Sequence, residues 1–251
     1  MRASLVELLT VLPGAQMTAD ASFDGISTNS KIIAAGNLFV ALRGERFDAH
    51  DFLNEVAAQG AAAVIAERVP DSFSLPALLV KDTRHALGEI ASLWRRRFSI
   101  PVIGVTGSNG KTTVKEMIAS ILDAAFGANH YLSTRGNLNN EIGVPLTLFR
   151  LDTMHRAAVI EMGMNHPGEI ARLAEIAGPT VGLVNNAQRE HQEFMASVAA
   201  VAEENAAVIR ALGDDACAVF PADDDYSALW QGYTGQRRSM TFGLEIGRAH
   251  V

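Results

Sequence analysis

The sequence is poor in three things: cysteine, positive charge and long apolar runs. A single cysteine, Cys217, allows no internal disulfide and no cysteine-based zinc site, which suits a reducing compartment. It lies in the apolar run 216–220, where we expect a buried strand. No apolar stretch approaches the roughly 20 residues that a membrane span needs, and Glu7 interrupts the short apolar N-terminus. We therefore expect a cytoplasmic protein with neither a membrane anchor nor a signal peptide.

Lysine and arginine number 21 against 28 aspartates and glutamates, which gives a formal net charge of −7. A nucleic-acid partner would need a basic face, so this balance argues against one. The apolar fraction of 48% and the charged fraction of 20% are typical of a globular protein. The 251 residues give room for two domains of ordinary size, and they contain no internal repeat or low-complexity linker.

The first hundred residues indicate a small α/β unit. A short helix over 5–12 ends at Pro13 and Gly14, and Asp82 is placed to cap a second helix that runs through Arg97. Apolar runs and spacing predict further strands over 37–42, 62–66 and 77–80 and a helix over 52–57. We place the domain boundary after residue 98, which gives domains 1–98 and 99–251.

Three successive cations, Arg95, Arg96 and Arg97, close that second helix. They would suit an anion, but cations at a helix C-terminus also interact favourably with the helix dipole. We prefer the dipole as their explanation.

From residue 100 onward, strands and helices alternate regularly. We predict strands over 102–105, 157–162, 181–185, 217–220 and 239–242 and helices over 112–126, 166–177, 197–212 and 226–232. This alternation implies right-handed crossovers and a mostly parallel sheet, so the predicted fold class is α/β. Ligands of such sheets bind at the carboxyl ends of the strands, and the polar clusters described next all fall there.

A glycine-rich string, Gly-Val-Thr-Gly-Ser-Asn-Gly-Lys-Thr-Thr, occupies 104–113 between a predicted strand and a predicted helix. Its glycines let backbone N–H groups point into one concavity, Lys111 supplies a positive charge, and the Thr112 hydroxyl suits Mg²⁺. The usual Walker pattern has glycine where this chain has Val105, so this is a shortened variant. We predict a phosphate-binding loop rather than a surface turn, formed by Gly107, Ser108, Asn109, Gly110, Lys111, Thr112 and Thr113.

The helix after this loop is predicted to be amphipathic. Its buried face is expected from apolar residues at helical spacing, Val114, Met117, Ile118, Ile121 and Leu122. The polar residues expected on other faces are Lys115, Glu116 and Asp123.

Three more polar strings follow predicted strands. Glu161 ends a buried strand, where a Mg²⁺ ligand is usual beside a phosphate loop, although a solvated acid also fits. The string 136–145, with three asparagines and two glycines, favours a hydrogen-bonding loop over a plain turn before a helix at 147–149. Helix capping explains His166 only in part, and His191, in the string 185–191, fits a structural or a functional role equally well.

In this order, the motifs resemble those of the Mur ligase family. The segments that carry the resemblance to its central ATPase domain are 107–113, 136–145, 161–169 and 185–191, and those similar to its UDP-binding domain are 27–30, 36–52 and 82–84. The asparagine-rich string and 47–52 resemble the family members that add D-alanyl-D-alanine rather than a diamino acid. The resemblance therefore implies an N-terminal UDP-binding domain followed by an ATPase domain.

The resemblance also implies a reaction. Mur ligases use ATP to convert a carboxylate into an acyl phosphate, which an incoming amine attacks. The implied cofactors are ATP and Mg²⁺, and the implied substrates are UDP-N-acetylmuramoyl-tripeptide and D-alanyl-D-alanine, in peptidoglycan precursor synthesis. A monomer without nucleic-acid or membrane partners is expected.

Roles carried over from the family fall on matching positions of this sequence. Lys111 would neutralise the transferring phosphoryl group, and Thr112, Glu161 and His191 would lie at the metal, with His191 also beside the acyl phosphate. The residues implied to meet the UDP-sugar are Ser30, Arg43, Phe47, Asp48 and His50. Those implied to line the space between nucleotide and acceptor are Asn139, Asn140 and His166.

Two features depart from the family pattern. Mur ligases often carry a carbamate-modified lysine that helps a second Mg²⁺, but no lysine follows Lys115 here. Asn205 falls about at that position, and Glu203 or Glu204 could supply the charge directly, so a second Mg²⁺ is left open. The family also has a third domain that binds the incoming dipeptide, whereas this chain stops at Val251.

We therefore expect a truncated product in which 245–251 form a foreign tail. A truncated product opens an alternative function, a nucleotide-binding fragment without ligase activity. Two others remain: the family member that adds a diamino acid, and a small-molecule kinase or other P-loop NTPase.

Overall fold

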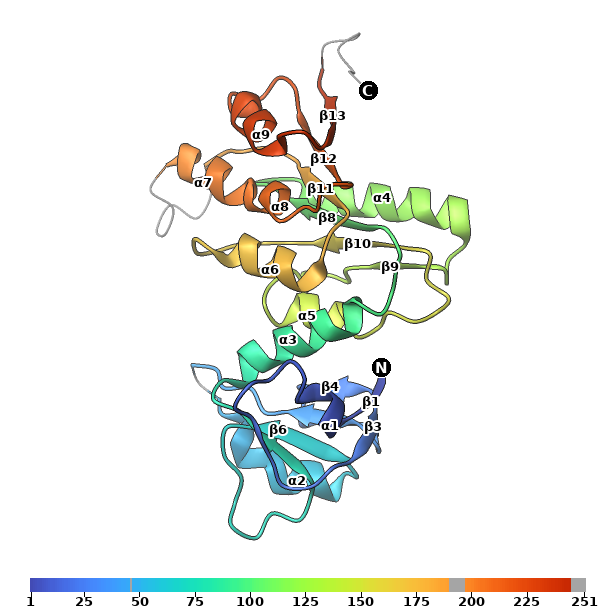
Figure 1. The fold of residues 1–251 in the computed structure, drawn as a ribbon, viewed down its shortest axis with the longest axis vertical. Coiled ribbons are helices and arrows are strands. Elements are labelled where there is room, and N and C mark those ends of the chain that lie inside the picture. The colour runs from blue at the N-terminus through green and yellow to red at the C-terminus, as the bar shows by residue number, and fades with distance from the viewer. Residues whose placement is uncertain (46, 190–196, 245–251) are drawn as a thin grey trace. The chain divides into compact units, whose positions relative to one another are not determined.

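The computed structural model describes residues 1–45, 47–189 and 197–244, and the chain divides into two compact units, Met1–Trp94 and Arg95–Val251 (Figure 1). The division falls within α3 (Thr83–Arg95), a few residues before the boundary expected after 98. Asp82 caps this helix as predicted, since its Oδ1 accepts the backbone N–H groups of Arg84 at 2.8 Å and His85 at 2.9 Å.

The first unit is built on a five-stranded sheet in the order β2-β7-β6-β5-β4. All neighbours are parallel except β2 and β7. The strands of this sheet are β2 (Gln16–Met17), β4 (Ile26–Ser27), β5 (Leu38–Val40), β6 (Ala63–Ala66) and β7 (Ala77–Leu79). A small antiparallel pair, β1 (Arg2–Ser4) and β3 (Ser22–Asp24), and the helices α1 (Leu5–Leu8), η1 (Ala49–Phe52) and α2 (Leu53–Ala58) complete it. Strands β1 to β4 were not predicted, because two or three residues are too few to show an alternation.

The second unit contains a six-stranded sheet in the order β13-β12-β11-β8-β10-β9, in which every pair of neighbours is parallel. Its strands are β8 (Val102–Thr106), β9 (Tyr131–Ser133), β10 (Ala157–Glu161), β11 (Val181–Val184), β12 (Cys217–Pro221) and β13 (Arg238–Phe242). This confirms the predicted α/β class and all five predicted strands. The short strand β9 was missed, and Cys217 is half-buried rather than buried.

The helices of the second unit are α4 (Lys111–Phe126), α5 (Gly143–Leu148), α6 (Glu169–Ala177), α7 (Val198–Asn205), α8 (Ala207–Arg210) and α9 (Ser227–Thr234). Helix α6 begins three residues later than predicted, because Gly168 before it is left-handed, at φ +92°. The single helix predicted over 197–212 is two helices, separated at Ala206. No helix in the part of the chain that the structure describes is long and apolar enough to cross a membrane.

Helix α4 shows the largest error in the sequence analysis. Met117 and Ile121, predicted to be buried, are 62% and 66% exposed, whereas Lys115 is fully buried. The buried residues of α4 are Lys115, Ala119 and Leu122, spaced i, i+4 and i+7, and Ala119 and Leu122 pack against strand residues such as Val105 and Val159. Leu122 is buried as predicted, and the predicted Val114 and Ile118 are partly buried against the same cluster, so the buried face is shifted toward Lys115 and Ala119 and away from Met117 and Ile121.

Candidate functional site

The parallel register brings three predicted polar segments to one edge of the second unit's sheet. Strand β8 lies between β10 and β11, with Glu161 opposite Val105 and Val184 opposite Thr106. The chain continues from these positions into the glycine-rich loop, the segment after Glu161 and the string that starts at Asn185. The carboxyl ends of the central strands thus meet at one place, which is where α/β sheets bind their ligands.

The loop between β8 and α4 has a backbone that only glycine adopts readily. Gly107 and Gly110 have φ values of +136° and +75°, and Gly110 caps α4 in the left-handed conformation. A Cβ on Gly107 would lie 2.9 Å from the Cβ of Asn185, which is closer than real contacts allow. Both glycines are therefore required by geometry, and the loop leads directly into the N-terminus of α4 as a phosphate site requires.

Lys111, the first residue of α4, folds back over this loop. Its Nζ donates to the carbonyl oxygens of Gly107 at 2.5 Å and Ser108 at 3.0 Å. Thr113 lies exposed in the same first turn. The ammonium group is therefore held against the backbone of the glycine-rich loop.

Glu161 sits at the centre of the site and is only 2% exposed. Its Oε1 accepts the Thr112 hydroxyl at 3.1 Å and the Asn139 side-chain amide at 2.8 Å. Its Oε2 is buried and has no hydrogen-bond partner among the residues that the structure describes. A buried carboxylate oxygen left unpaired costs free energy, and a hard cation is its natural partner.

Thr112 and Glu161 thus fit Mg²⁺. They provide two oxygen ligands, and this ion usually completes its shell with water and substrate phosphates. No group of three His, Cys, Asp or Glu side chains among the described residues could hold a metal by itself. The donors present therefore suit a nucleotide-bound Mg²⁺ better than a closed metal site.

A second loop, residues 185–188 after β11, holds the glycine-rich loop in place. Asn109 donates its backbone N–H to Asn186 Oδ1 at 3.0 Å and its side-chain amide to Gln188 Oε1 at 2.8 Å. Its carbonyl accepts from the side chains of Asn185 and Asn186. Ser108 and Gln188 exchange two further bonds. The individual roles of these residues were not predicted, although the polar string itself gave the signal.

The remaining predicted residues of this unit are placed differently. Asn140 accepts the N–H groups of Ile142 and Gly143 on its side-chain oxygen and so starts α5. The backbone N–H of exposed His166 donates to Glu169 Oε2 at 3.2 Å, which is a capping role. His191 lies outside the described residues.

The three candidates for the position of the family's modified lysine have separate roles. Glu204 accepts the N–H groups of Gly168 and Ile170, both at 2.9 Å, and caps α6. Glu203 pairs with Arg210 and accepts the Tyr233 hydroxyl. Only Asn205 reaches the strand before the glycine-rich loop, where its Oδ1 accepts the Thr106 hydroxyl at 2.6 Å.

In the first unit, the residues predicted to meet a UDP-sugar fall into an exposed and a buried group. Arg43 is exposed, and Phe47 is 48% exposed and stacks on Phe52 with ring centroids 5.1 Å apart. Ser30 is buried, and its carbonyl accepts the Gln59 side-chain amide at 2.9 Å. Arg43 also forms an isolated bridge with Asp48, which connects the two groups.

His50 is engaged entirely within this unit. Its Nε2 accepts the backbone N–H of Glu67 at 2.9 Å, and its Nδ1 lies 2.6 Å from Asp48 Oδ1. Because Nε2 accepts, the proton of the neutral ring is on Nδ1 and is donated to Asp48. Arg68 donates to the other Asp48 oxygen at 2.8 Å. His50, predicted to meet the UDP-sugar, thus also supports the segment around Asp48 and Glu67.

Burial acts to raise the pKa of the Asp48 carboxyl, but hydrogen bonds from Arg68 and His50 outweigh it and hold that pKa well below its ordinary value. We expect Asp48→Asn to lower the free energy of unfolding of the first unit at neutral pH and to lower it less in acid. A depressed pKa contributes stability above the unfolded-state value, about 4, and that stability is lost as the pH falls toward the folded-state pKa. Urea unfolding of both proteins at pH 7 and pH 3 measures the difference.

Asp71, an exposed acid of the same unit, gives the matched control. Asp71→Asn should have little effect at either pH. A loss from Asp48→Asn that is larger at pH 3 than at pH 7 would contradict the assignment.

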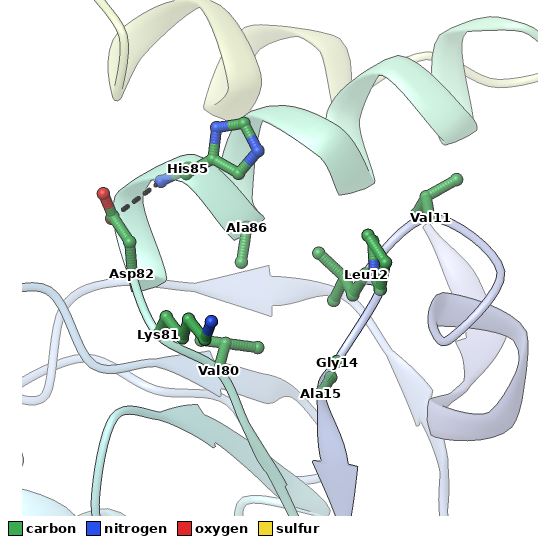
Figure 2. Close-up of a pocket in the computed structure, with 10 residues that line it drawn as sticks. Val11, Leu12, Gly14, Ala15, Val80, Lys81, Asp82, His85 and Ala86 are labelled. Atoms are coloured by element: carbon green, nitrogen blue, oxygen red, sulfur yellow. Dashed lines mark hydrogen bonds between the residues drawn. The ribbon is translucent and has the colours of Figure 1, made fainter.

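Two cavities of the first unit differ in character. A mostly apolar one of about 170 Å³ lies between the segment after α1 and the start of α3, with Lys81, Asp82 and His85 among its lining residues (Figure 2). None of the predicted site residues lines it. A more polar one of about 330 Å³ is lined by His50, Asp51 and Arg68 together with neighbouring residues. The second cavity is therefore the one beside the predicted UDP-sugar residues.

Comparisons with known proteins agree with this architecture. Residues 105–250 match the family model "Mur ligase middle domain", and residues 22–95 match "Mur ligase family, catalytic domain". The first match includes 245–250, which were expected to leave the family pattern. The chain is 43% identical over 239 residues to the UDP-N-acetylmuramoyl-tripeptide–D-alanyl-D-alanine ligase of Escherichia coli (strain K12), covering 95% of this chain and 52% of that protein.

Solved structures give the same relationship. A crystal structure of MurF from Acinetobacter baumannii has a TM-score of 0.89 and 34% identity, covering 97% of this chain and 54% of that one. The MurF ligase of Thermotoga maritima, solved in complex with ADP, has a TM-score of 0.80 and 36% identity, covering 88% and 50%. The chain spans about half the length of these relatives. With two family matches across most of its length and a site of the expected composition, the chain belongs to the Mur ligase family.

Proposed function

We propose that this chain provides the nucleotide-binding and UDP-precursor-binding parts of an ATP-dependent ligase that joins D-alanyl-D-alanine to UDP-N-acetylmuramoyl-tripeptide. The 43% identity to an enzyme with that printed name supports this member of the family over the one that adds a diamino acid. Residues of unit Arg95–Val251 would bind ATP, and residues of unit Met1–Trp94 would bind the UDP-sugar.

The observation that carries the proposal is the buried Oε2 of Glu161, which no described residue pairs with, beside the Thr112 hydroxyl at the edge where the glycine-rich loop begins. In that position Thr112 and Glu161 would hold Mg²⁺, which would supply positive charge to the phosphates of a bound nucleotide. The loop N–H groups and Lys111 would bind the same phosphates. The ADP complex of the Thermotoga maritima relative supports a nucleotide at this site.

In the proposed reaction, a carboxylate oxygen of the UDP-linked peptide attacks the γ-phosphorus of ATP, and ADP leaves. The amine of D-alanyl-D-alanine then attacks the resulting acyl phosphate, inorganic phosphate leaves, and the amine nitrogen loses a proton. Lys111 neutralises charge on the transferring phosphoryl group, and Asn139 keeps Glu161 in position. These contributions are positioning and charge neutralisation, which are the main protein contributions to phosphoryl transfer. We assign His191 to the acyl phosphate and the metal.

In the first unit, the exposed Arg43 and Phe47 have the chemistry to contact a UDP-sugar, a cation for the diphosphate and an aromatic face for a ring. Ser30, Asp48 and His50, which are less exposed, would form the inner wall of the same site. We expect Arg43→Ala to weaken UDP-precursor binding without affecting ADP binding, because the two residue sets lie in separate units.

Calorimetric titration of this chain tests the proposal. We expect saturable binding of ADP when Mg²⁺ is present. We also expect saturable binding of UDP-N-acetylmuramoyl-tripeptide, with weaker binding of the corresponding dipeptide precursor.

A turnover assay that measures ADP released from ATP tests the reaction. ADP release that requires both the tripeptide precursor and D-alanyl-D-alanine supports the ligase. ADP release that requires neither would overturn the proposal in favour of a P-loop NTPase or small-molecule kinase.

Because the chain covers about half the length of its relatives, a second candidate is a nucleotide-binding fragment without ligase activity. Tight binding of both ligands, with no ligation by this chain alone, would favour this candidate.

A further inference from the structure

Lys115 is a fully buried cation in a part of the second unit that the proposed chemistry does not use. It has no exposed surface, and its Nζ donates to the Thr134 carbonyl at 3.0 Å and pairs with the Glu116 carboxylate. The Glu116 side chain is 65% exposed, so the buried bond is the one to Thr134. Burying an ammonium group is costly unless hydrogen bonds compensate it, and an apolar residue would fill this position at less cost. The position therefore calls for an explanation beyond packing.

Thr134 is the residue through which Lys115 reaches the rest of the site. It follows β9 directly and is 1% exposed. Its N–H donates to Val159 of β10 at 3.2 Å, and its hydroxyl accepts the N–H of Glu161 at 2.9 Å. Its carbonyl accepts from Lys115. All three polar atoms of Thr134 are thus used, and two of them bond to β10.

These bonds form a second connection between α4 and Glu161. The first is direct, from the Thr112 hydroxyl to Glu161 Oε1 at 3.1 Å. The second runs from Lys115, three residues further along α4, through Thr134 to the backbone N–H of Glu161. Residues three apart on a helix are neighbours, so both connections start from the same side of α4. Figure 1 shows α4 lying beside β8, β9 and β10 in the second unit, and these elements are in contact.

We propose that Lys115 is a positioning residue for the metal and phosphate site. By fixing Thr134 against α4, it sets the distance between the helix that carries Lys111 and Thr112 and the strand end that carries Glu161. Mg²⁺ demands near-ideal octahedral geometry at short distances, so its affinity depends on that separation more than nucleotide binding without metal does. The proposal rests on the proposed Mg²⁺-dependent nucleotide binding.

The test compares ADP affinity with excess Mg²⁺ and with EDTA, in the 251-residue chain and in Lys115→Met. The wild-type chain should bind ADP more tightly with Mg²⁺. In EDTA, Lys115→Met should bind ADP with an affinity close to that of the wild type. The increase in ADP affinity that Mg²⁺ gives should be about tenfold smaller in Lys115→Met than in the wild type, the change expected for one charge-assisted hydrogen bond. A purely structural role would lower the melting temperature and leave that gain unchanged, which would overturn the proposal.

A second pair of variants keeps the test decisive if Lys115→Met fails to fold. Thr134→Val keeps the carbonyl but removes the hydroxyl that accepts the Glu161 N–H, so it should lose the same gain. Thr134→Ser retains the hydroxyl and should keep the Mg²⁺-dependent gain in ADP affinity. Where Lys115→Met does fold, combining it with Thr134→Val should add little further loss, since both act on one connection. Equal gains in Thr134→Val and Thr134→Ser would overturn the inference, whereas absence of any gain in the wild type would overturn the proposed metal site instead.

Discussion

Lys111→Met should reduce the affinity of this chain for Mg²⁺·ADP and Mg²⁺·ATP by about a hundredfold, the scale expected when charge-assisted hydrogen bonds to phosphate are lost. Lys111 begins α4 and holds its ammonium group over the loop, bonded to the carbonyls of Gly107 and Ser108. In the proposed complex, Lys111 would exchange these two bonds for bonds to phosphate oxygens, and its positive charge would then attract the phosphates. Isothermal titration calorimetry measures the loss directly.

The first unit supplies an internal control for this variant. Binding of the UDP-linked tripeptide should be unchanged in Lys111→Met, because its proposed residues lie in Met1–Trp94. The melting temperature should also change little, since Lys111 is only partly buried and lies at a helix end. A variant that binds nucleotide with wild-type affinity would remove the glycine-rich loop from the proposed site.

The sheet and the glycine-rich loop before α4 were predictable because each has a local signature. Apolar runs that alternate with amphipathic helical segments predicted five of the six parallel strands of the second unit. The carboxyl ends of parallel strands lie at one edge of the sheet, so the position of the polar segments followed. Gly107 and Gly110 indicated a loop with positive φ angles, which no other residue adopts readily. The place of Glu161 was predictable because an acid that ends a buried apolar strand must lie at that edge of the sheet.

What the sequence analysis missed depends on long-range contacts. Lys115 was placed off the buried face because the apolar spacing of α4 excluded it, and its partner Thr134 follows a three-residue strand that has no periodicity of its own. The hydrogen bond from the Glu67 N–H to His50 joins residues that are 17 positions apart and was not predicted. In both cases the sequence does not reveal a hydrogen bond to a distant backbone atom.

Arg95 is a third case. The helix dipole was the preferred explanation for Arg95, Arg96 and Arg97 together, but Arg95 is buried and the other two are exposed. The Arg95 guanidinium donates to the carbonyls of Ala177 at 3.0 Å and Gly178 at 3.2 Å, which end α6. It also donates to two carbonyls of the segment that enters β8, Phe98 at 2.5 Å and Ile100 at 3.2 Å. Burial lowers the pKa of this guanidinium without neutralising it.

Arg95→Met should therefore destabilise the second unit by about 3 kcal/mol, because it leaves several buried carbonyls without a donor. Arg96→Met, at the exposed neighbouring position, should change stability by less than about 0.5 kcal/mol. Hydrogen exchange of the β8 and β11 amides reports on this unit separately from the first. Equal protection in the two variants would mean that water replaces the guanidinium at these carbonyls. A large loss in Arg95→Met alone would mean that one arginine joins the end of α6 to the start of β8, the strand that leads into the glycine-rich loop.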